Sequence, residues 1–226
     1  MDARALDIVV YDAPVPYGWM LEEQHRTRAA VQSGARPNTL FLLEHEAVIS
    51  CGRNAHEDNI LLSRERLATL GVAVHTADRG GDVTYHGPGQ LVAYPILNLN
   101  QWKPSVGWYL RSLEQVLIAL LRDYGLQGER VEGMTGVWVN GAKVAAIGVG
   151  VHQWVSFHGI ALNVSANLEH FGFIVPCGIA DKPVASLRRL LPSPPTLPEV
   201  RAAFVRHFQE VFEVAGRDAT RTDLDA

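Results

Sequence analysis

The sequence is short of cysteine, of long apolar runs and of dense basic runs. It has two cysteines in 226 residues, Cys51 and Cys177, which lie far apart. Residues 1–12 lack the basic end and apolar core of a signal sequence, and no apolar run approaches the roughly 20 residues that cross a bilayer. We therefore expect a cytoplasmic protein with two free thiols and no membrane partner.

The charge is weak and evenly spread. The formal net charge is -4, and the absence of a Lys/Arg cluster argues against a nucleic-acid partner. With 47% hydrophobic residues, no internal repeat and 226 residues, the chain suits one large domain or two small ones. We predict a single domain over residues 1–216, followed by a frayed C-terminal tail at 217–226.

Short strands in hairpin order, flanked by several helices, predict an α+β domain with a mostly antiparallel or mixed sheet. Ser63 and Ser105 are expected to cap two of the helices, and Gly125 to end the second. The predicted helices cover residues 17–32, 63–71, 105–124 and 199–214, and the predicted strands cover 6–11, 39–43, 47–50, 72–77, 83–85, 91–97, 136–149 and 154–164.

The stretch from Arg79 to Gln90, R-G-G-D-V-T-Y-H-G-P-G-Q, is dense in glycine and places a histidine at the end of a short strand. Glycine lets the backbone adopt positive φ and approach a ligand, and Gly87-Pro88-Gly89 favours a rigid reversal. A purely structural glycine-rich hairpin is the alternative. The number of special residues in one stretch favours a binding surface.

A second hairpin is expected over residues 136–149, with Asn140-Gly141 at its tip. A two-residue turn pairs Trp138 with Lys143, and strict alternation would then place Lys143, Ala145 and Ile147 on one face of the second strand. The alternative is that Lys143 extends into solvent at the sheet edge. In the next strand, His158-Gly159 is expected to break the pairing, with the glycine allowing close backbone approach.

Two further sites, Cys177 and the set Glu44, His45 and His56, have competing interpretations. Cys177 stands in a P-C-G turn, where a thiol is either functional or a small apolar side chain in the core. Glu44, His45 and His56 have no familiar metal-ligand spacing. We interpret them as solvated loop side chains and predict no metal site.

Three blocks, in this order, resemble a known family. They are R-G-G-D-V-T-Y-H-G-P-G-Q-L at 79–91, A-K-V-A-A-I-G at 142–148 followed by F-H-G-I-A-L-N-V at 157–164, and P-C-G-I at 176–179. The pattern is similar to the lipoyl(octanoyl) transferases, the lipoate-protein ligase B family, within the biotin and lipoate protein ligase catalytic-domain superfamily. ATP-dependent lipoate ligases resemble the first block only loosely.

The resemblance implies a biotin/lipoate protein ligase type of α+β fold and an acyltransferase activity. The expected reaction moves an octanoyl group from acyl carrier protein to a lysine of lipoyl domains, such as those of 2-oxoacid dehydrogenase E2 subunits and the glycine cleavage H protein. It also implies that Cys177 is the nucleophile and Lys143 its acid/base partner, and that a monomer acts without a metal, nucleotide or other cofactor.

By the same resemblance, the backbone N–H groups of Gly80, Gly81, Gly148 or Gly159 are expected to hold the thioester oxygen. His86 and His158 should orient the carbonyl and the cysteine loop, while Val83, Ile147 and Ile160 should line an acyl tunnel. The predicted substrate-binding residues are Arg79, Gly80, Gly81, Asp82, Val83, Thr84, Tyr85, His86, Ala146, Ile147, Gly148, His158, Gly159, Ile160 and Ala161.

Two other functions remain possible from the sequence. An ATP-dependent lipoate or biotin ligase would use the lysine on an acyl-adenylate and would need no cysteine, but P-C-G-I and H-G-P-G-Q argue against it. A non-catalytic binder of carrier domains would keep the pocket and form no acyl-enzyme. Release of AMP distinguishes the first from a transferase, and formation of an acyl-enzyme distinguishes the second.

Overall fold

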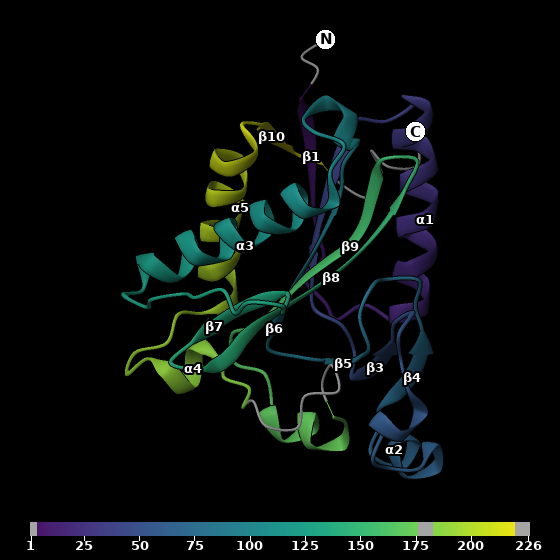
Figure 1. Ribbon diagram of the computed structural model, residues 1–226, viewed down its shortest axis with the longest axis vertical. Coiled ribbons are helices and arrows are strands. Elements are labelled where there is room, and N and C mark those ends of the chain that lie inside the picture. The colour runs from purple at the N-terminus through teal and green to yellow at the C-terminus, as the bar shows by residue number, and fades with distance from the viewer. Residues whose placement is uncertain (1–3, 176–182, 220–226) are drawn as a thin grey trace.

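The computed structural model describes residues 4–175 and 183–219. A mixed seven-stranded sheet runs through the molecule in the order β10-β1-β2-β6-β9-β8-β7 (Figure 1). Its strands are β1 (Ala5–Val10), β2 (Asn38–Leu43), β6 (Gln90–Ile96), β7 (Gly136–Val139), β8 (Ala142–His152), β9 (Val155–Asn163) and β10 (Ala215–Asp218). The β1 strand pairs in parallel with both β2 and β10, and the other neighbours are antiparallel. This confirms the predicted mixed sheet.

A second, three-stranded sheet sits at one end of the first (Figure 1). It consists of β4 (Ala73–Thr76), β3 (Val48–Cys51) and β5 (Val83–His86), with β3 in the centre. The strand β3 is parallel to β4 and antiparallel to β5. This small sheet therefore carries the glycine-rich stretch, because residues 77–82 connect β4 to β5.

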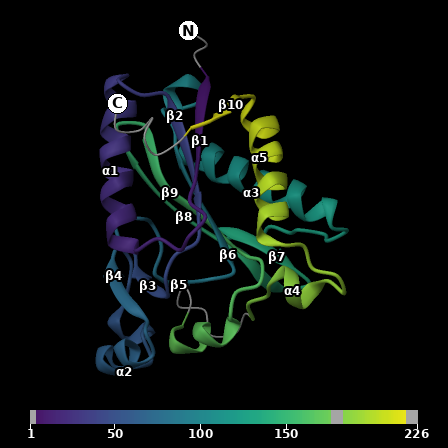
Figure 2. The same ribbon diagram turned by 180° about the vertical axis from the view of Figure 1, so that it is seen from behind.

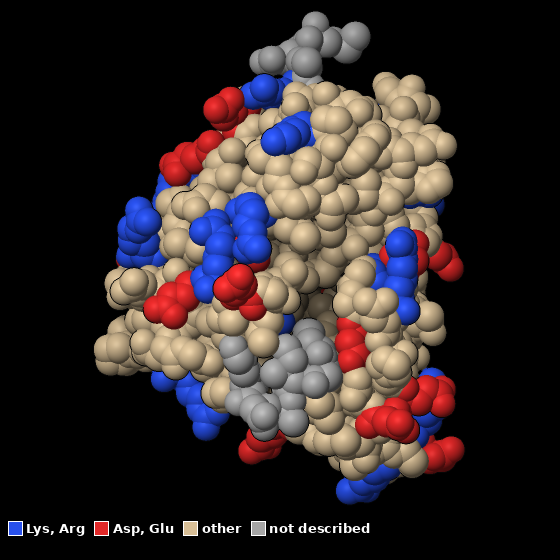
Figure 3. Space-filling view, viewed as in Figure 1, with Lys and Arg blue, Asp and Glu red and all other residues tan. Residues whose placement is uncertain are grey.

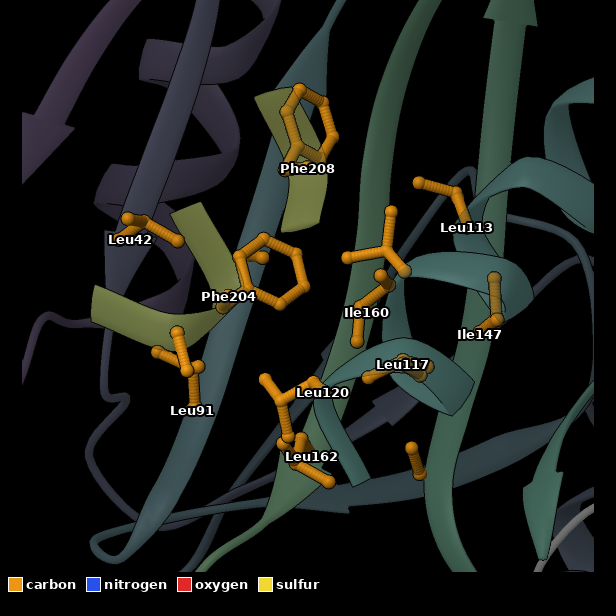
Figure 4. Packing of buried hydrophobic residues seen from close by; sticks show 14 of the residues in the cluster. Leu42, Leu91, Leu113, Leu117, Leu120, Ile147, Ile160, Leu162, Phe204 and Phe208 are labelled. Atoms are coloured by element: carbon orange, nitrogen blue, oxygen red, sulfur yellow. The ribbon is translucent and has the colours of Figure 1, made fainter. Parts of the chain in front are cut away.

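Helices cover both faces of the large sheet. The helices α3 (Val106–Asp123) and α5 (Leu197–Phe212) lie on one face, and α1 (Tyr17–Ser33) lies on the other (Figures 1 and 2). Phe204 and Phe208 of α5 pack with Leu117 and Leu120 of α3 over Ile160 of β9 (Figure 4). This continuous apolar layer packs α3 and α5 against the large sheet and forms the main hydrophobic core.

The shorter elements complete the fold. They are α2 (Arg64–Thr69), α4 (Leu187–Leu190) and the 3₁₀ turns Glu57–Asn59, Leu99–Gln101 and Leu168–Phe173. The side chain of Ser63 accepts a hydrogen bond from Arg66 N, and that of Ser105 accepts one from Trp108 N, as predicted. Gly125 has a φ of 72° just after α3, which also agrees with the sequence. No helix of the described ranges is long and apolar enough to cross a membrane.

The structure corrects two predictions, one about the C-terminal tail and one about a break in the strand that contains His158. Arg217 and Asp218 belong to β10 and are not a frayed tail, because the open edge of β1 offers them a parallel partner. Arg217 Nε also donates to Asp7 Oδ1 at 2.5 Å. In addition, the predicted break at His158-Gly159 is absent, because β9 pairs with β8 continuously through these residues. His158 keeps this pairing with a positive φ of 55°.

Candidate active site

A pocket lies between the β8–β9 part of the large sheet, the loop before β5 and the start of α1. Its empty volume is about 480 Å³, including space open to solvent. Figure 3 shows a hollow on this side of the molecule, with acidic and basic side chains interspersed around it. The lining residues are Tyr17, Arg79, Gly80, Gly81, Thr84, His86, Tyr94, Lys143, Ala146, Ile147, Gly148, His158, Gly159, Ile160 and Ala161.

The structure thus brings together two sequence blocks that are more than 50 residues apart. The predicted substrate-binding residues all line the pocket except Asp82, Val83 and Tyr85. Two lining residues, Tyr17 on α1 and Tyr94 on β6, were not predicted. Neither stands in a special local pattern, so only the packing of α1 and β6 against the site reveals them.

The Arg-Gly-Gly loop lies directly on β8. Gly80 N donates to Val149 O at 2.8 Å, and the position of a Cβ on Gly148 is only 3.1 Å from Gly80 O. A side chain on Gly148 would therefore push the loop away from the strand. Because the N–H of Gly80 is already bonded within the fold, we correct the expectation that it holds the thioester oxygen.

Arg79 anchors this loop to the small sheet. Its side chain is only 7% exposed, and it donates from Nη2 to Ser50 O at 2.6 Å and from Nε to Ser50 Oγ at 3.2 Å. These bonds join the loop to β3, in the centre of the small sheet. The buried guanidinium therefore supports the roof of the pocket and contributes a positive charge close to it.

Lys143 is turned toward the pocket by a β-bulge. Trp138 pairs with Lys143 and Val137 with Ala145, so Val144 is an extra residue on β8 with no partner on β7. Ala145 and Ile147 belong to the core under α3 and α5, whereas Lys143 Nζ lies 5.1 Å from the ring centre of Trp138, on the other face. The prediction that Lys143 shares a face with Ala145 and Ile147 is therefore wrong, because a bulge shifts the alternation by one residue.

The chain after the P-C-G-I block is bonded to Lys143, and the chain before the block is bonded to the 3₁₀ turn Glu57–Asn59. Lys143 N donates to Pro183 O at 2.8 Å, and Ala185 N donates to Lys143 O at 2.9 Å. Before the block, Val175 N donates to Asn59 O at 2.8 Å. Cys177 itself lies outside the described residues, so its predicted place beside Lys143 stays a prediction.

His45 is buried next to the pocket, and both of its ring nitrogens have hydrogen-bond partners. It is fully buried, with Nδ1 2.7 Å from Val15 O and Nε2 2.8 Å from the hydroxyl of Tyr94. Burial lowers its pKa to about 4, so the neutral ring donates to the carbonyl and accepts from the tyrosine. The interpretation of His45 as a solvated loop residue is wrong, because the approach of α1 to β6 encloses it.

His86 is also buried and neutral. Its Nδ1 lies 2.8 Å from Gln90 Oε1, its Nε2 lies 3.3 Å from Ser50 Oγ, and burial holds its pKa well below the ordinary value. The ring stacks on Tyr17 with centres 5.9 Å apart. His86 therefore shapes the pocket as a fixed, uncharged polar group.

The buried His158 and the partly exposed Asp78 form a hydrogen-bonded pair at the end of the pocket farthest along β8 from Lys143. His158 Nε2 lies 2.9 Å from Asp78 Oδ1, and Asp78 Oδ2 lies 3.1 Å from His25 Nε2. Although burial opposes ionisation, the hydrogen bond and the positive potential of these histidines lower the pKa of Asp78 to about 2. Burial lowers the pKa of His158 despite the carboxylate, so its Nε2–H donates to Asp78.

The remaining predicted site residues stabilise the small sheet. Asp82 Oδ1 accepts from Val83 N at 2.8 Å and from His56 N at 3.2 Å. Val83 and Tyr85 are almost fully buried in the core of that sheet, and the Tyr85 hydroxyl contacts His170 Nδ1 at 2.8 Å. None of the three lines the pocket, so Val83 is not part of a tunnel wall; alternation along β5 turns it and Tyr85 away from Thr84.

No group of three or more histidine, cysteine or carboxylate side chains is arranged to hold a metal ion in residues 4–175 and 183–219. The polar groups of the pocket are instead an arginine, a lysine and neutral histidines and tyrosines, set among glycine and apolar residues. Such a site suits an apolar ligand with one reactive polar end.

Comparison with known proteins agrees with this geometry. Residues 16–209 match the family described as lipoyl protein ligase A/B catalytic domain. The octanoyltransferase of Solibacter usitatus is 48% identical over 199 residues, covering 88% of this chain and 90% of that protein. The octanoyltransferase of Thermosynechococcus vestitus is 50% identical over 212 residues, covering 93% and 92% respectively.

Solved structures share the fold at low sequence identity. A lipoate-protein ligase A bound with ATP has a TM-score of 0.78 at 16% identity, over 100% of this chain and 92% of that one. A bi-partite lipoate protein ligase from Thermoplasma acidophilum, studied with its E2 lipoyl domain, has a TM-score of 0.77 at 16% identity, over 98% and 90%. The fold, the motif blocks and these relatives together show that the chain belongs to the lipoyl protein ligase A/B catalytic domain family and is an acyltransferase.

Proposed function

We propose that the protein transfers an octanoyl group from acyl carrier protein to the ε-amino group of a lysine on lipoyl domains, through a thioester on Cys177. One observation carries the proposal most directly. Lys143, turned to the pocket by the bulge, shares backbone hydrogen bonds with Pro183 and Ala185, which follow the P-C-G-I block closely in the chain. The names of the similar octanoyltransferases support the same acyl group.

The first half-reaction loads the enzyme. The Cys177 thiolate attacks the carbonyl carbon of the octanoyl thioester, a new C–S bond forms, and the bond to the phosphopantetheine sulfur breaks. A free thiol has a pKa of roughly 8.5 and needs a cation or base nearby to ionise at neutral pH. Lys143 supplies this by taking the thiol proton and then giving it to the departing sulfur.

The second half-reaction unloads it. The lysine amine of the lipoyl domain attacks the acyl carbon, an amide bond forms, and the Cys177 sulfur leaves as a thiolate. Lys143 accepts the proton that the amine loses and returns it to the cysteine for the next cycle. Atoms and charges balance without a nucleotide, a metal or a redox partner.

The pocket suits the acyl part of this substrate. The cross-strand pair Ala146 and Ala161 gives it an apolar wall, whereas the side chains of Ile147 and Ile160 belong to the core on the other face of the sheet. The missing side chain of Gly148 leaves room for the Arg-Gly-Gly loop. Gly81 remains a candidate donor to the thioester oxygen, in place of Gly80. We propose that the protein acts in the cytoplasm as a monomer and meets its carrier proteins through transient interfaces of about 1,200 Å² or less.

Intact-mass measurement after incubation with octanoyl acyl carrier protein tests the nucleophile. We expect one octanoyl adduct on the wild type and on Cys51→Ala, and none on Cys177→Ala. Cys51 is the matched control because burial raises the pKa of its thiol, which disfavours the thiolate. An adduct that survives Cys177→Ala would refute the proposed mechanism.

An ATP-dependent ligase is the second candidate, because a lipoate-protein ligase A bound with ATP has the same fold. It would release AMP when incubated with ATP, octanoate and a lipoyl domain, and it would act without Cys177. If the protein shows neither octanoyl transfer nor AMP release, it is a non-catalytic binder of carrier domains. The two assays on one preparation therefore separate all three functions.

A further inference from the structure

A groove opens on the surface beside α4. We call it the α4 groove. Its lining comes from two segments, residues 165–169, which follow β9, and residues 183–189, which include most of α4. Arg188 N donates to Val164 O at 2.8 Å, and this bond joins the two segments. The empty volume of the groove is about 1200 Å³, including space open to solvent, so it has room for a flexible chain.

The α4 groove leads to the active-site pocket. Val184 lines the groove and also lines a small pocket that contains Lys143. Four residues of that small pocket line the main pocket as well, namely Thr84, Lys143, Ala146 and Ala161. Because neighbouring pockets share these residues, a flexible ligand that lies in the α4 groove can reach Lys143 from the surface.

Two arginines give the groove a positive charge. Arg188 and Arg189 are exposed and line the groove, and neither side chain has an ion pair or hydrogen bond with another described residue. Figure 3 shows basic side chains on the surface at α4. Among the described lining residues, Glu169 is the only acidic one, and it lies on the other segment. Two adjacent guanidinium groups of this kind suit a phosphate, which arginine binds through parallel hydrogen bonds.

The distance from the arginines to Lys143 matches the arm of the acyl donor. In phosphopantetheine, about 13 bonds separate the phosphorus from the sulfur, so the extended arm spans about 16 Å at about 1.2 Å per bond. Val184 pairs with Lys143 and precedes Arg188 by four residues, which span at most about 14 Å. With the thioester at Lys143, the phosphate would therefore lie within reach of Arg188 and Arg189.

We propose that the α4 groove binds the phosphopantetheine arm of the acyl donor, with Arg188 and Arg189 on its phosphate. This rests on the proposed acyl-transfer function, because it takes Lys143 as the place where the thioester reacts. The acceptor lysine must also reach Lys143. Its amino group carries no negative charge for the two arginines to bind, so the charge of the groove favours the donor.

The matched donors are octanoyl-phosphopantetheine and octanoyl-pantetheine, which share the acyl chain and the arm and differ only in the phosphate. Intact-mass measurement of acyl-enzyme formation at several donor concentrations gives kcat/KM for each. We expect the wild type to prefer the phosphorylated donor about tenfold or more, in keeping with charge-assisted hydrogen bonds to the phosphate. Added salt should weaken this preference. Equal kcat/KM values for the two donors would overturn the proposal.

Variants locate the effect. The double variant Arg188→Gln, Arg189→Gln should lose most of the phosphate preference and load from octanoyl-pantetheine at the wild-type rate. The double lysine variant at the same positions should keep part of the preference, because it keeps the charge. Arg66→Gln is the control, since Arg66 is exposed on α2 and does not line the groove. A double glutamine variant that keeps the full preference would contradict the assignment.

The second half-reaction tests the competing occupant. Isolated octanoyl-enzyme should transfer its acyl group to a lipoyl domain equally fast in the wild type and in the double glutamine variant. If the variant instead slows only this step, the groove holds the acceptor and the proposal is wrong.

Binding without acyl transfer keeps this inference separate from the proposed function. Calorimetry compares phosphopantetheine with pantetheine on the wild type and on the double glutamine variant. If no donor loads the protein but the wild type alone binds phosphopantetheine more tightly, the transfer function fails and the groove assignment stands. If octanoyl acyl carrier protein loads the enzyme and the two short donors react equally, the transfer function stands and the groove assignment is wrong.

Discussion

Lys143 and Val184 form a parallel backbone bridge, in which Lys143 bonds to the residues on either side of Val184. The bridge connects the strand that carries the lysine to the chain that leaves the P-C-G-I block. Val184 and Lys143 also line a second, smaller pocket together with Phe171 and Asn163. The position of the lysine is therefore set by main-chain bonds, and changes to its side chain should leave the fold intact.

Replacing Lys143 by Ala should raise the pKa of the Cys177 thiol by about one unit or more, because in the proposed mechanism the Lys143 ammonium lies beside the thiol and favours the thiolate. Both half-reactions should slow, while the thermal unfolding midpoint changes little. The measurement is the rate of alkylation of Cys177 against pH, performed on the Cys51→Ala background. Lys143→Arg is the control for charge, and it should restore the low thiol pKa without restoring proton transfer. An alkylation profile unchanged in Lys143→Ala would refute the role of the lysine.

Two glycine substitutions should separate folding from function. A Cβ on Gly159 would overlap Ala93 O inside the sheet, so Gly159→Ala should destabilise the protein by about 2 kcal/mol or more. On Gly148 it would meet Gly80 O and Arg79 Cδ at 3.1 and 3.2 Å, at the roof of the pocket. Gly148→Ala should therefore cost about 1 kcal/mol or less and reduce octanoyl transfer by about tenfold or more.

Urea unfolding and acyl-enzyme formation are measured on both variants. Gly172→Ala is the control, because no atom lies within 4 Å of its added Cβ. A Gly148→Ala variant with normal transfer would contradict the assignment of the acyl pocket.

The stability of the protein should fall as the pH drops from about 6.5 toward 4. Burial lowers the folded-state pKa of His45 to about 4, while the unfolded chain has the ordinary value near 6.5, so the unfolded state binds more protons in this window. The stabilisation by neutral His45 is fully present above pH 6.5 and is lost progressively below it. At about 1.4 kcal/mol per unit, the loss between pH 7 and pH 5 amounts to about 2 kcal/mol.

Urea unfolding at pH 7 and pH 5 checks this for the wild type and for His45→Gln. The variant should be less stable at pH 7, but its loss between the two pH values should be smaller. The exposed His152→Gln is the control and should keep the wild-type pH dependence. An equal pH dependence in His45→Gln and wild type would show that other groups control the transition.

The acceptor should be recognised as a folded domain and not as a free lysine. Positioning a lysine at the mouth of the pocket accounts for much of the rate of an acyl transfer. Isolated octanoyl-enzyme should therefore transfer its acyl group much faster to a folded lipoyl domain than to a short lysine peptide at equal concentration. Equal rates would show that the enzyme does not recognise the carrier domain.

The sequence by itself determined much of the local structure. Ser63, Ser105 and Gly125 cap their helices as predicted, and Asn140-Gly141 forms the turn that pairs Trp138 with Lys143. Each depends on residues that are neighbours in the chain, where the conformational preferences of serine, asparagine and glycine decide the result. The glycine-rich and lysine-containing blocks likewise indicated most of the pocket, because both contain residue types that a simple hairpin does not need.

Only the tertiary structure decided which face each side chain takes and which groups are buried. The bulge at Val144 turns Lys143 away from Ala145, the edge of β1 orders Arg217 and Asp218, and the packing of α1 against β6 encloses His45 with Tyr94. These outcomes depend on partners that are distant in sequence. A one-residue shift in strand pairing reverses the faces, and desolvation by a distant helix sets the charge of a histidine, so no local pattern in the chain encodes either.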